Sequence, residues 1–244
     1  MTGVASVSAG GAHTMVIKQD GSLWATGNSY YGRLGAGTTT NRKTPVQVMT
    51  GVASVSAGDA HTMVIKQDGS LWAMGGNGSG RLGDGTTNNR GIPVQVMTGV
   101  ASVSASYRHT MVIKQDGSLW AMGDNHSGQL GDGTTTDRMT PVQVMTGVAS
   151  VSGGRYHTMV IKQDGSLWAM GDNWVGQLGD GTTTDRMTPV QVLTGVASVS
   201  GGGAHTMVIK QDGSLWAMGD NYSGQLGDGT TTPRKTPVPV VSGG

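Results

Sequence analysis

Five His-Thr pairs are the most regular polar feature of the sequence, and they recur at a constant interval of 48 residues. Imidazoles in equivalent positions could bind a metal ion or titrate near neutral pH. A metal would require the rings to converge on one point, and a repeat protein copies every scaffold residue into each repeat. We therefore interpret these histidines as structural groups that brace a turn, and we expect no metal and no cofactor: His13, His61, His109, His157 and His205.

Other chemically reactive residues are poorly placed for catalysis. The chain contains no cysteine and no glutamate, and most aspartates recur in the same turns of each repeat. The segment "GDGTTTD" lacks the alternating oxygen ligands and the distal glutamate of an EF-hand calcium loop. The segment "GRLGAG" is glycine-rich but lacks the strand-to-helix setting of a phosphate-binding loop. Because catalysis needs a unique, asymmetric group of residues, we expect that the protein is not an enzyme.

The spacing of "TGVASVS" divides the chain into five repeats within a single domain, 1–244. With 43 glycines, no phenylalanine, 13% charged residues and a net charge of +1, the composition is that of a turn-rich β protein. No basic run suggests nucleic acid, and no long apolar run suggests a signal peptide or a membrane segment. We expect a soluble protein with these repeats: 2–49, 50–97, 98–145, 146–193 and 194–241.

Each repeat contains four short runs that are typical of β-strands. In the fourth repeat these runs are 148–152, 157–163, 166–171 and 188–192. Four strands per repeat predict an all-β fold, a five-bladed β-propeller with four-stranded antiparallel blades. The Asp-Gly pair between the second and third strands predicts a two-residue hairpin turn in which both residues have positive φ.

The long segment 171–187 is the candidate passage from one blade to the next. This interpretation makes the fourth strand an inner strand and the third an outer one. It also pairs the C-terminal run 236–241 with the N-terminal run 4–8 in one composite blade that closes the ring. The alternative is that each repeat forms one whole blade.

The spaced set "HTMVIKQDGSLWAMGDNxxGQLGDG" resembles the repeat of the regulator-of-chromosome-condensation family. The resemblance covers all five repeats and implies a β-propeller, although family members typically have seven blades. The founding member acts on a Ran-type GTPase and chromatin through special loops and a basic tail, which this sequence lacks. The plant photoreceptors of the family carry tryptophan before His-Thr, which is also missing here. Bacterial β-lactamase inhibitory proteins of this fold, which bind through aromatic residues on one face, are the nearest analogy.

Most differences between repeats fall in two windows, the turn before His-Thr and the segment after the third strand. Strand alternation predicts that both windows lie on one face. Tyrosine, tryptophan and arginine dominate binding hot spots, whereas drift at exposed positions is the plainer explanation. We expect a partner-binding face, concentrated on the third and fourth repeats, that consists of Tyr30, Tyr31, Asp59, Tyr107, Arg108, His126, Arg155, Tyr156, Trp174 and Tyr222.

The sequence thus favours a binding scaffold for a protein partner. Lectin-like glycan binding and a ligand-free designed propeller remain alternatives. The near-identity of the repeats indicates a recent amplification or an engineered protein, and we favour the latter. One tryptophan per repeat never changes and is expected to be structural: Trp24, Trp72, Trp120, Trp168 and Trp216.

Overall fold

The computed structural model describes residues 1–241, which form five four-stranded antiparallel sheets, one from each repeat. The first sheet contains β1 (Val4–Ala9), β2 (His13–Lys18), β3 (Leu23–Gly27) and β4 (Arg42–Met49). The second contains β5 (Val52–Ala57), β6 (His61–Lys66), β7 (Leu71–Gly75) and β8 (Arg90–Met97). The third contains β9 (Val100–Ala105), β10 (His109–Lys114), β11 (Leu119–Gly123) and β12 (Arg138–Met145).

The fourth sheet contains β13 (Val148–Gly153), β14 (His157–Lys162), β15 (Leu167–Gly171) and β16 (Arg186–Leu193). The fifth contains β17 (Val196–Gly201), β18 (His205–Lys210), β19 (Leu215–Gly219) and β20 (Arg234–Pro239). In every sheet the strands follow one another in chain order, so the prediction of five four-stranded antiparallel sheets is confirmed. One short 3₁₀ helix, η1 (Tyr30–Gly32), lies in the loop between β3 and β4.

The predicted composite blade is wrong, because the fourth strand of each repeat pairs with the third strand of the same repeat. In the second sheet, for example, Trp72 is opposite Gln95 and Ala73 is opposite Val94. The C-terminal β20 likewise pairs with β19, and β1 pairs with β2. The long loop therefore returns to its own sheet. The short Thr-Gly segment carries the chain to the next sheet, and the third strand is an interior strand of the sheet.

The Asp-Gly hairpin forms in every repeat, but its loop is not the predicted two-residue type. Gly21 has a φ of 75°, whereas Asp20 is not among the residues with positive φ. The Gly21 amide donates to the Lys18 carbonyl, and the Lys18 amide donates to the Ser22 carbonyl. These bonds describe a turn followed by a left-handed glycine, as in three-residue hairpin loops. The Asp20 carboxylate favours this form because it accepts bonds from the Ser22 amide and hydroxyl.

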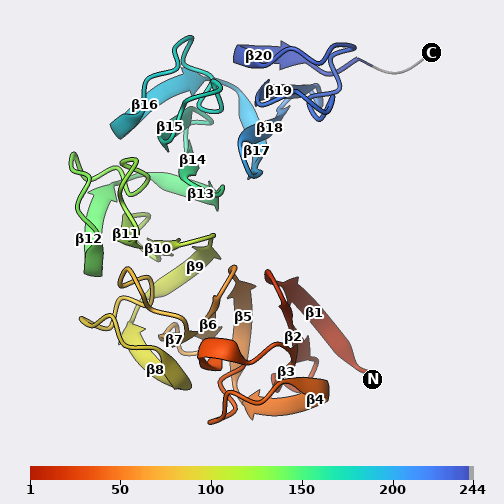
Figure 1. The fold of residues 1–244 in the computed structure, drawn as a ribbon, viewed down its shortest axis with the longest axis vertical. Helices are drawn as coiled ribbons and strands as arrows, with labels where there is room; N and C mark the ends of the chain where they lie inside the picture. The colour runs from red at the N-terminus through yellow and green to blue at the C-terminus, as the bar shows by residue number, and fades with distance from the viewer. Residues whose placement is uncertain (242–244) are drawn as a thin grey trace. The chain divides into compact units, whose positions relative to one another are not determined.

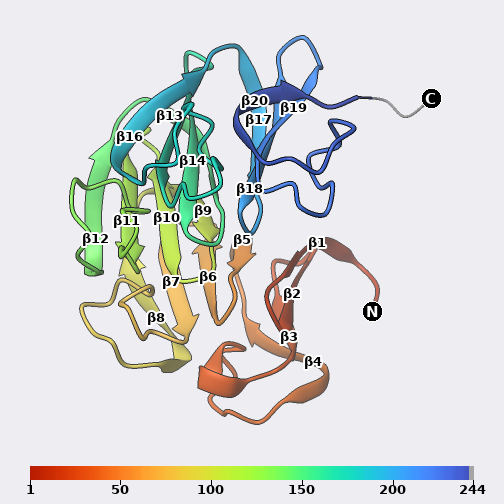
Figure 2. The ribbon, with the colours of Figure 1, turned by 45° about the horizontal axis from the view of Figure 1, so that its top comes forward.

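In the first unit the apolar core lies between consecutive sheets, and the second strand of the middle sheet, β6, is buried on both faces. Side chains alternate along β6, so Met63 and Ile65 pack toward the third sheet while Val64 packs toward the first. On β7, Leu71 joins the former group and Met74 joins the latter. Figure 1 and Figure 2 show β5 of the second sheet beside the first sheet, drawn in red and orange.

The chain divides into two compact units. The first comprises Met1–Asp124 with Asp137–Val142, and the second comprises Asn125–Thr136 with the residues from Gln143 onward. Among residues 1–241 there is no helix of the length and apolar character needed to cross a bilayer.

Candidate functional site

Backbone hydrogen bonds hold the two variable windows of each repeat together at one end of the sheet. The Gly76 amide, after β7, donates to the carbonyl of Ala60 in the turn before His61, with an N···O distance of 2.8 Å. Gly75 permits this approach, since it has a φ of 106° and a methyl group there would lie 2.6 Å from the Ala60 oxygen. The same bond links Asp172 to Tyr156 in the second unit. Each repeat therefore presents its two windows as one surface.

A buried asparagine organises the long loop of most repeats. Asn77 is fully buried, and its Oδ1 accepts a bond from the Leu82 amide at 3.0 Å. Its Nδ2 donates to the Asp84 carboxylate and to the Thr86 carbonyl. Asp84 in turn forms an ion pair with Arg90 at the start of β8. The loop is thus fixed from within, so the residues at its tip can differ without altering its path.

The His-Thr pairs lie where consecutive repeats meet. His13 Nε2 lies 2.8 Å from Thr62 Oγ1, and Thr62 Oγ1 donates to the Arg33 carbonyl at 2.8 Å. Because the threonine proton is committed to that carbonyl, the hydroxyl accepts from a His13 that is protonated on Nε2. His61 and His157 form the same bond with the threonine of the following repeat.

Burial keeps these histidines neutral. It lowers the pKa of His157 to about 4, with a contribution from the neighbouring His205. It also lowers the pKa of His13 to about 4, with a contribution from the Arg33 charge. The pKa of His61 is held well below its usual range by burial and by Arg81. These contacts support the structural role proposed for the histidines.

The unchanging tryptophans lie at the opposite end of the strands, beside the Asp-Gly turns. The Trp24 indole donates to the Ser22 hydroxyl at 2.9 Å, and this hydroxyl donates to Asp20. The Lys18 ammonium lies 5.9 Å from the center of the Trp24 ring. The hydrogen bonds recur in all five repeats, on the side chains of Trp72, Trp120, Trp168 and Trp216. This end of the sheets therefore carries the same contacts throughout.

Side chains from three consecutive repeats line one pocket of about 370 Å³ in the first unit. Four of its large side chains come from the variable windows, and another, that of Arg81, follows the second window. A neighbouring hollow of about 420 Å³ shares two lining residues with it, Tyr31 and Asn89. The structure thus brings four residues of the predicted face together around this pocket, where Arg81 joins them: Tyr31, Asp59, Tyr107 and Arg108.

The pocket is hollow because the second repeat carries glycine at two loop positions where other repeats have larger side chains. A methyl group at Gly76 would lie 3.4 Å from the ring of Tyr31, which covers this position. One at Gly78 would lie 3.8 Å from Nη2 of Arg81. In the fourth repeat the position of Gly78 is occupied by Trp174. The small residues of the second repeat therefore leave the Arg81 guanidinium accessible from the pocket.

Arg33 and Arg81 occupy equivalent positions in two repeats but differ in the hydrogen bonds that their side chains make. Arg33 donates from Nε to the Tyr30 carbonyl and from Nη1 to the Asp59 carbonyl, both at 3.0 Å. Arg81 is as buried as Arg33, at 8% exposed, but its Nε has no hydrogen-bond partner among the described residues. Its Nη1 makes one long bond, 3.3 Å, to the Tyr107 carbonyl. Burial and the nearby charge of Arg108 lower the pKa of Arg81, although the carboxylates of Asp124 and Asp59 act in the opposite direction.

The remaining predicted residues lie elsewhere on the same ends of the sheets. Tyr30 is exposed and lies against Tyr31, with ring centers 4.3 Å apart. In the second unit, the Arg155 guanidinium lies 5.3 Å from the center of the Tyr156 ring. Trp174 and Tyr222 project into solvent, at 62% and 67% exposed, and His126 is exposed as well.

The first repeat departs from the others in its loop. Ser29 and Ala36 replace the asparagine and the aspartate, and the Arg42 Nε is left without a partner among residues 1–241. Here the chain forms η1, in which Tyr31 has a φ of 67°, and η1 packs against β7 and β8 of the next sheet (Figure 1). A non-glycine residue in this region is strained, and such strain is concentrated at functional sites. The altered loop delivers Tyr31 to the pocket.

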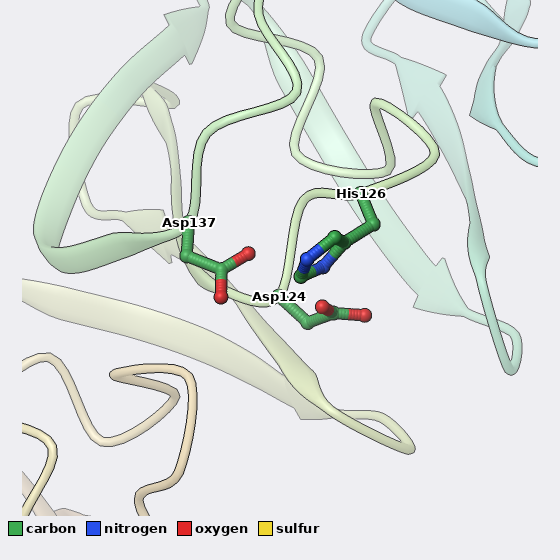
Figure 3. Close-up of side chains that lie close together, drawn as sticks. All are labelled: Asp124, His126 and Asp137. Atoms are coloured by element: carbon green, nitrogen blue, oxygen red, sulfur yellow. The ribbon is translucent and has the colours of Figure 1, made fainter.

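Figure 3 shows the side chains of Asp124, His126 and Asp137, from the loop between β11 and β12. Asp124 and Asp137 belong to the first unit and His126 to the second. Asp124 is buried, Asp137 is half-buried and His126 is exposed, and we assign no metal site to this group.

Arg81 is not among the residues predicted from the sequence. The repeats carry Arg33, Arg81, Gln129, Gln177 and Gln225 at this position, a difference that lies just outside the two windows. Each glutamine accepts a bond from the backbone amide two residues earlier. The change from glutamine to arginine was the available indication, whereas the hollow beside the Arg81 guanidinium comes from Gly76 and Gly78.

Comparison with known proteins identifies the fold. The family described as the RCC1-like domain matches residues 1–243. The crystal structure of human WBSCR16 is similar over 98% of this chain and 67% of its own, with 22% identity and a TM-score of 0.86. Yeast RCC1 (Prp20), solved with Kap60 bound, is similar over 98% of this chain and 75% of its own, with 15% identity and a TM-score of 0.61. The sequence motifs, the sheets and these matches agree that the chain belongs to the RCC1-like domain family of β-propellers.

Proposed function

We propose that this protein is a non-enzymatic binding module that recognises a protein partner through the variable ends of its sheets. One observation carries the proposal: variable side chains of three consecutive repeats line a single pocket in the first unit. Tyrosine and arginine are enriched among residues that dominate binding energy, and tyrosine loses little conformational entropy when it binds. Yeast RCC1, which is similar in fold, was solved bound to a protein, Kap60.

A display library provides a test even while the partner is unidentified. The immobilised full chain is used to select 12-residue peptides from a random phage library, and the enriched peptides are then titrated against variants. Tyr31→Ala and Tyr107→Ala are expected to weaken binding, each by roughly 2 kcal/mol or about thirtyfold if the residue is a hot spot. Gln95→Ala, on the exposed edge strand β8, is the matched control and should bind as the parent does.

The alternatives predict other outcomes. Selection of sugars on a glycan array, without any peptide that depends on Tyr31 or Tyr107, would replace the proposal with a lectin function. The unequal windows argue against five equivalent sugar sites, since only the second repeat has glycine at both loop positions. The near-identical repeats fit an engineered scaffold whose loops were varied. In that case the tests above apply unchanged.

A further inference from the structure

We propose that the pocket around the second repeat binds a carboxylate of an acidic residue in a peptide segment, with Arg81 and Arg108 as its cationic ligands. This inference rests on the proposed function and names the chemistry that the partner presents. The central residue is Arg81, whose side chain is 8% exposed and lines the pocket.

A buried cation with few hydrogen-bond partners is costly. An arginine guanidinium carries five N–H donors in a planar fork that matches a carboxylate. Within residues 1–241, Arg81 uses its guanidinium only for the 3.3 Å bond to the Tyr107 carbonyl, and its Nε is unbonded. Leaving a buried donor without a partner destabilises the protein, and more so where the group is charged. Arg81 Nη2 lies next to Gly78 in the pocket lining, and a ligand that accepts from Nη2 gives the guanidinium a further partner.

The equivalent position elsewhere shows that this arrangement is specific to the second repeat. Arg33 has the same burial but satisfies Nε and Nη1 with two backbone carbonyls. In the last three repeats the residue is glutamine, which bonds the loop backbone. The scaffold therefore does not require an unpartnered arginine at this position.

The other lining residues define the shape of the ligand. Arg108, at the exposed rim, lies 5.3 Å from the center of the Tyr107 ring and adds a second positive charge near Arg81. Tyr31 and Tyr107 offer aromatic surface for an apolar side chain beside the carboxylate. Asp59 also lines the pocket, and its carboxylate can accept a backbone N–H. A peptide supplies all three features: an acid, an apolar neighbour and an N–H donor.

Amidated heptapeptide pools test this chemistry on the full chain. The central residue is glutamate in one pool, glutamine in the second and phosphoserine in the third, and the six flanking positions are randomised. We expect the parent protein to retain the glutamate pool at least tenfold over the glutamine pool. Free glutarate should compete only at much higher concentration, because it lacks the flanking contacts. Equal retention of glutamate and glutamine, or no retention of any pool, would overturn the proposal.

Variants taken from the repeats themselves identify the ligand residues. Arg81→Gln should abolish the preference for glutamate, whereas Arg33→Gln should preserve it. Gly78→Trp should block retention by filling the pocket, and tryptophan occupies the equivalent position in the fourth repeat. Identical behaviour of Arg81→Gln and Arg33→Gln would refute the assignment. Stronger retention of phosphoserine than of glutamate would make the natural anion a phosphate and would likewise refute the carboxylate.

Stability without ligand gives an independent readout. Arg81→Gln should raise the melting temperature or leave it unchanged, since glutamine can accept from the Ser79 amide as its counterparts do. Arg33→Gln should lower it, because two hydrogen bonds are lost. A lower melting temperature for Arg81→Gln would show that Arg81 is a structural residue, contrary to the proposal. Peptides that bind through Tyr31 and Tyr107 but ignore Arg81 would refute this inference and leave the proposed function intact.

Discussion

Asp59 and His61 are two residues apart, but the first is a variable residue at the surface and the second an unchanging residue in the interior. His61 is fully buried and bonds Thr110 of the next repeat, and its counterparts never change. Asp59 lines the pocket, and its counterparts are glycine, tyrosine and arginine. This difference indicates that buried contacts of unchanging residues, such as the His61–Thr110 bond, stabilise the repeats. At the turn before His-Thr, by contrast, the side chains differ from one repeat to the next.

The largest expected effect is on pH dependence, which tests the buried histidines. In the unfolded chain a histidine has a pKa of about 6.5, whereas His13 and His157 have a pKa of about 4 in the folded protein. Between these values the unfolded state binds more protons, so stability is complete above pH 6.5 and falls as the pH falls toward 4. Through these two residues together, the unfolding free energy should fall by about 4 kcal/mol between pH 7 and pH 5.

Chemical denaturation at the two pH values measures this difference. The aspartates of the Asp-Gly turns have a lowered pKa, chiefly because serine donates to them, so they remain ionised at pH 5. An unfolding free energy that is the same at pH 7 and pH 5 would mean that the histidines are accessible to protons in the folded state.

The next effect concerns the apolar core between sheets. Leu71 is fully buried, whereas Leu215 has the same place in the fifth sheet and is 39% exposed. Leu71→Ala should lose about 2–5 kcal/mol of unfolding free energy through lost contacts and a residual cavity. Leu215→Ala should lose distinctly less. Both losses are measured by chemical denaturation. Equal losses for the two variants would show that this leucine contributes the same stability whether it is buried or exposed, contrary to the prediction.

A smaller loss is expected at the junction of two repeats. Thr62→Val keeps the shape of the side chain but removes the hydroxyl that joins His13 to the Arg33 carbonyl. Two buried polar groups lose their partner, so we expect a cost of about 1–3 kcal/mol. Thr38→Val, at an exposed loop position, is the control for the substitution itself. If the Thr62→Val protein were as stable as the parent, the hydrogen bonds of Thr62 would not contribute to stability.

The smallest effect on stability should come from the variable residues. Trp174→Ala, at a position that is 62% exposed, should change the unfolding free energy by less than about 0.5 kcal/mol. A thermal melt beside the parent measures this change. A loss above about 1 kcal/mol, on the order of a lost buried hydrogen bond, would place this side chain among the structural contacts.

Much of the fold could be predicted because the repeats expose its period. The strand of His157–Lys162, the hairpin after it and the meeting of the two windows all follow from local pattern. The partner of the fourth strand could not be predicted in this way. In the structure, the loop that returns the chain to its own sheet contains side-chain bonds from Asn173 to Asp180 and to the Thr182 carbonyl. A period of 48 residues is equally compatible with either division into sheets.

The candidate site shows a similar limit. Tyr31, Asp59, Tyr107 and Arg108 stand out from the sequence because they differ between repeats and are types that bind. The pocket among them exists because glycines of the second repeat have no side chains to fill it. A glycine such as Gly78 in the sequence does not by itself indicate a binding site. Whether the Arg81 Nε finds a carbonyl depends on distances of a few tenths of an ångström, which only coordinates provide.

The buried asparagine has a consequence for how this protein can change. Between Asn77 and Asp84 the chain is closed on itself by side-chain and backbone bonds, and the same closure recurs at Asn173 and Asn221. Because the bonds that fix this loop lie within it, the loop can be exchanged between repeats as a unit, together with the side chains at its tip. Four repeats share this loop, so new combinations of loop tips can arise by recombination while the fold of the loop is kept.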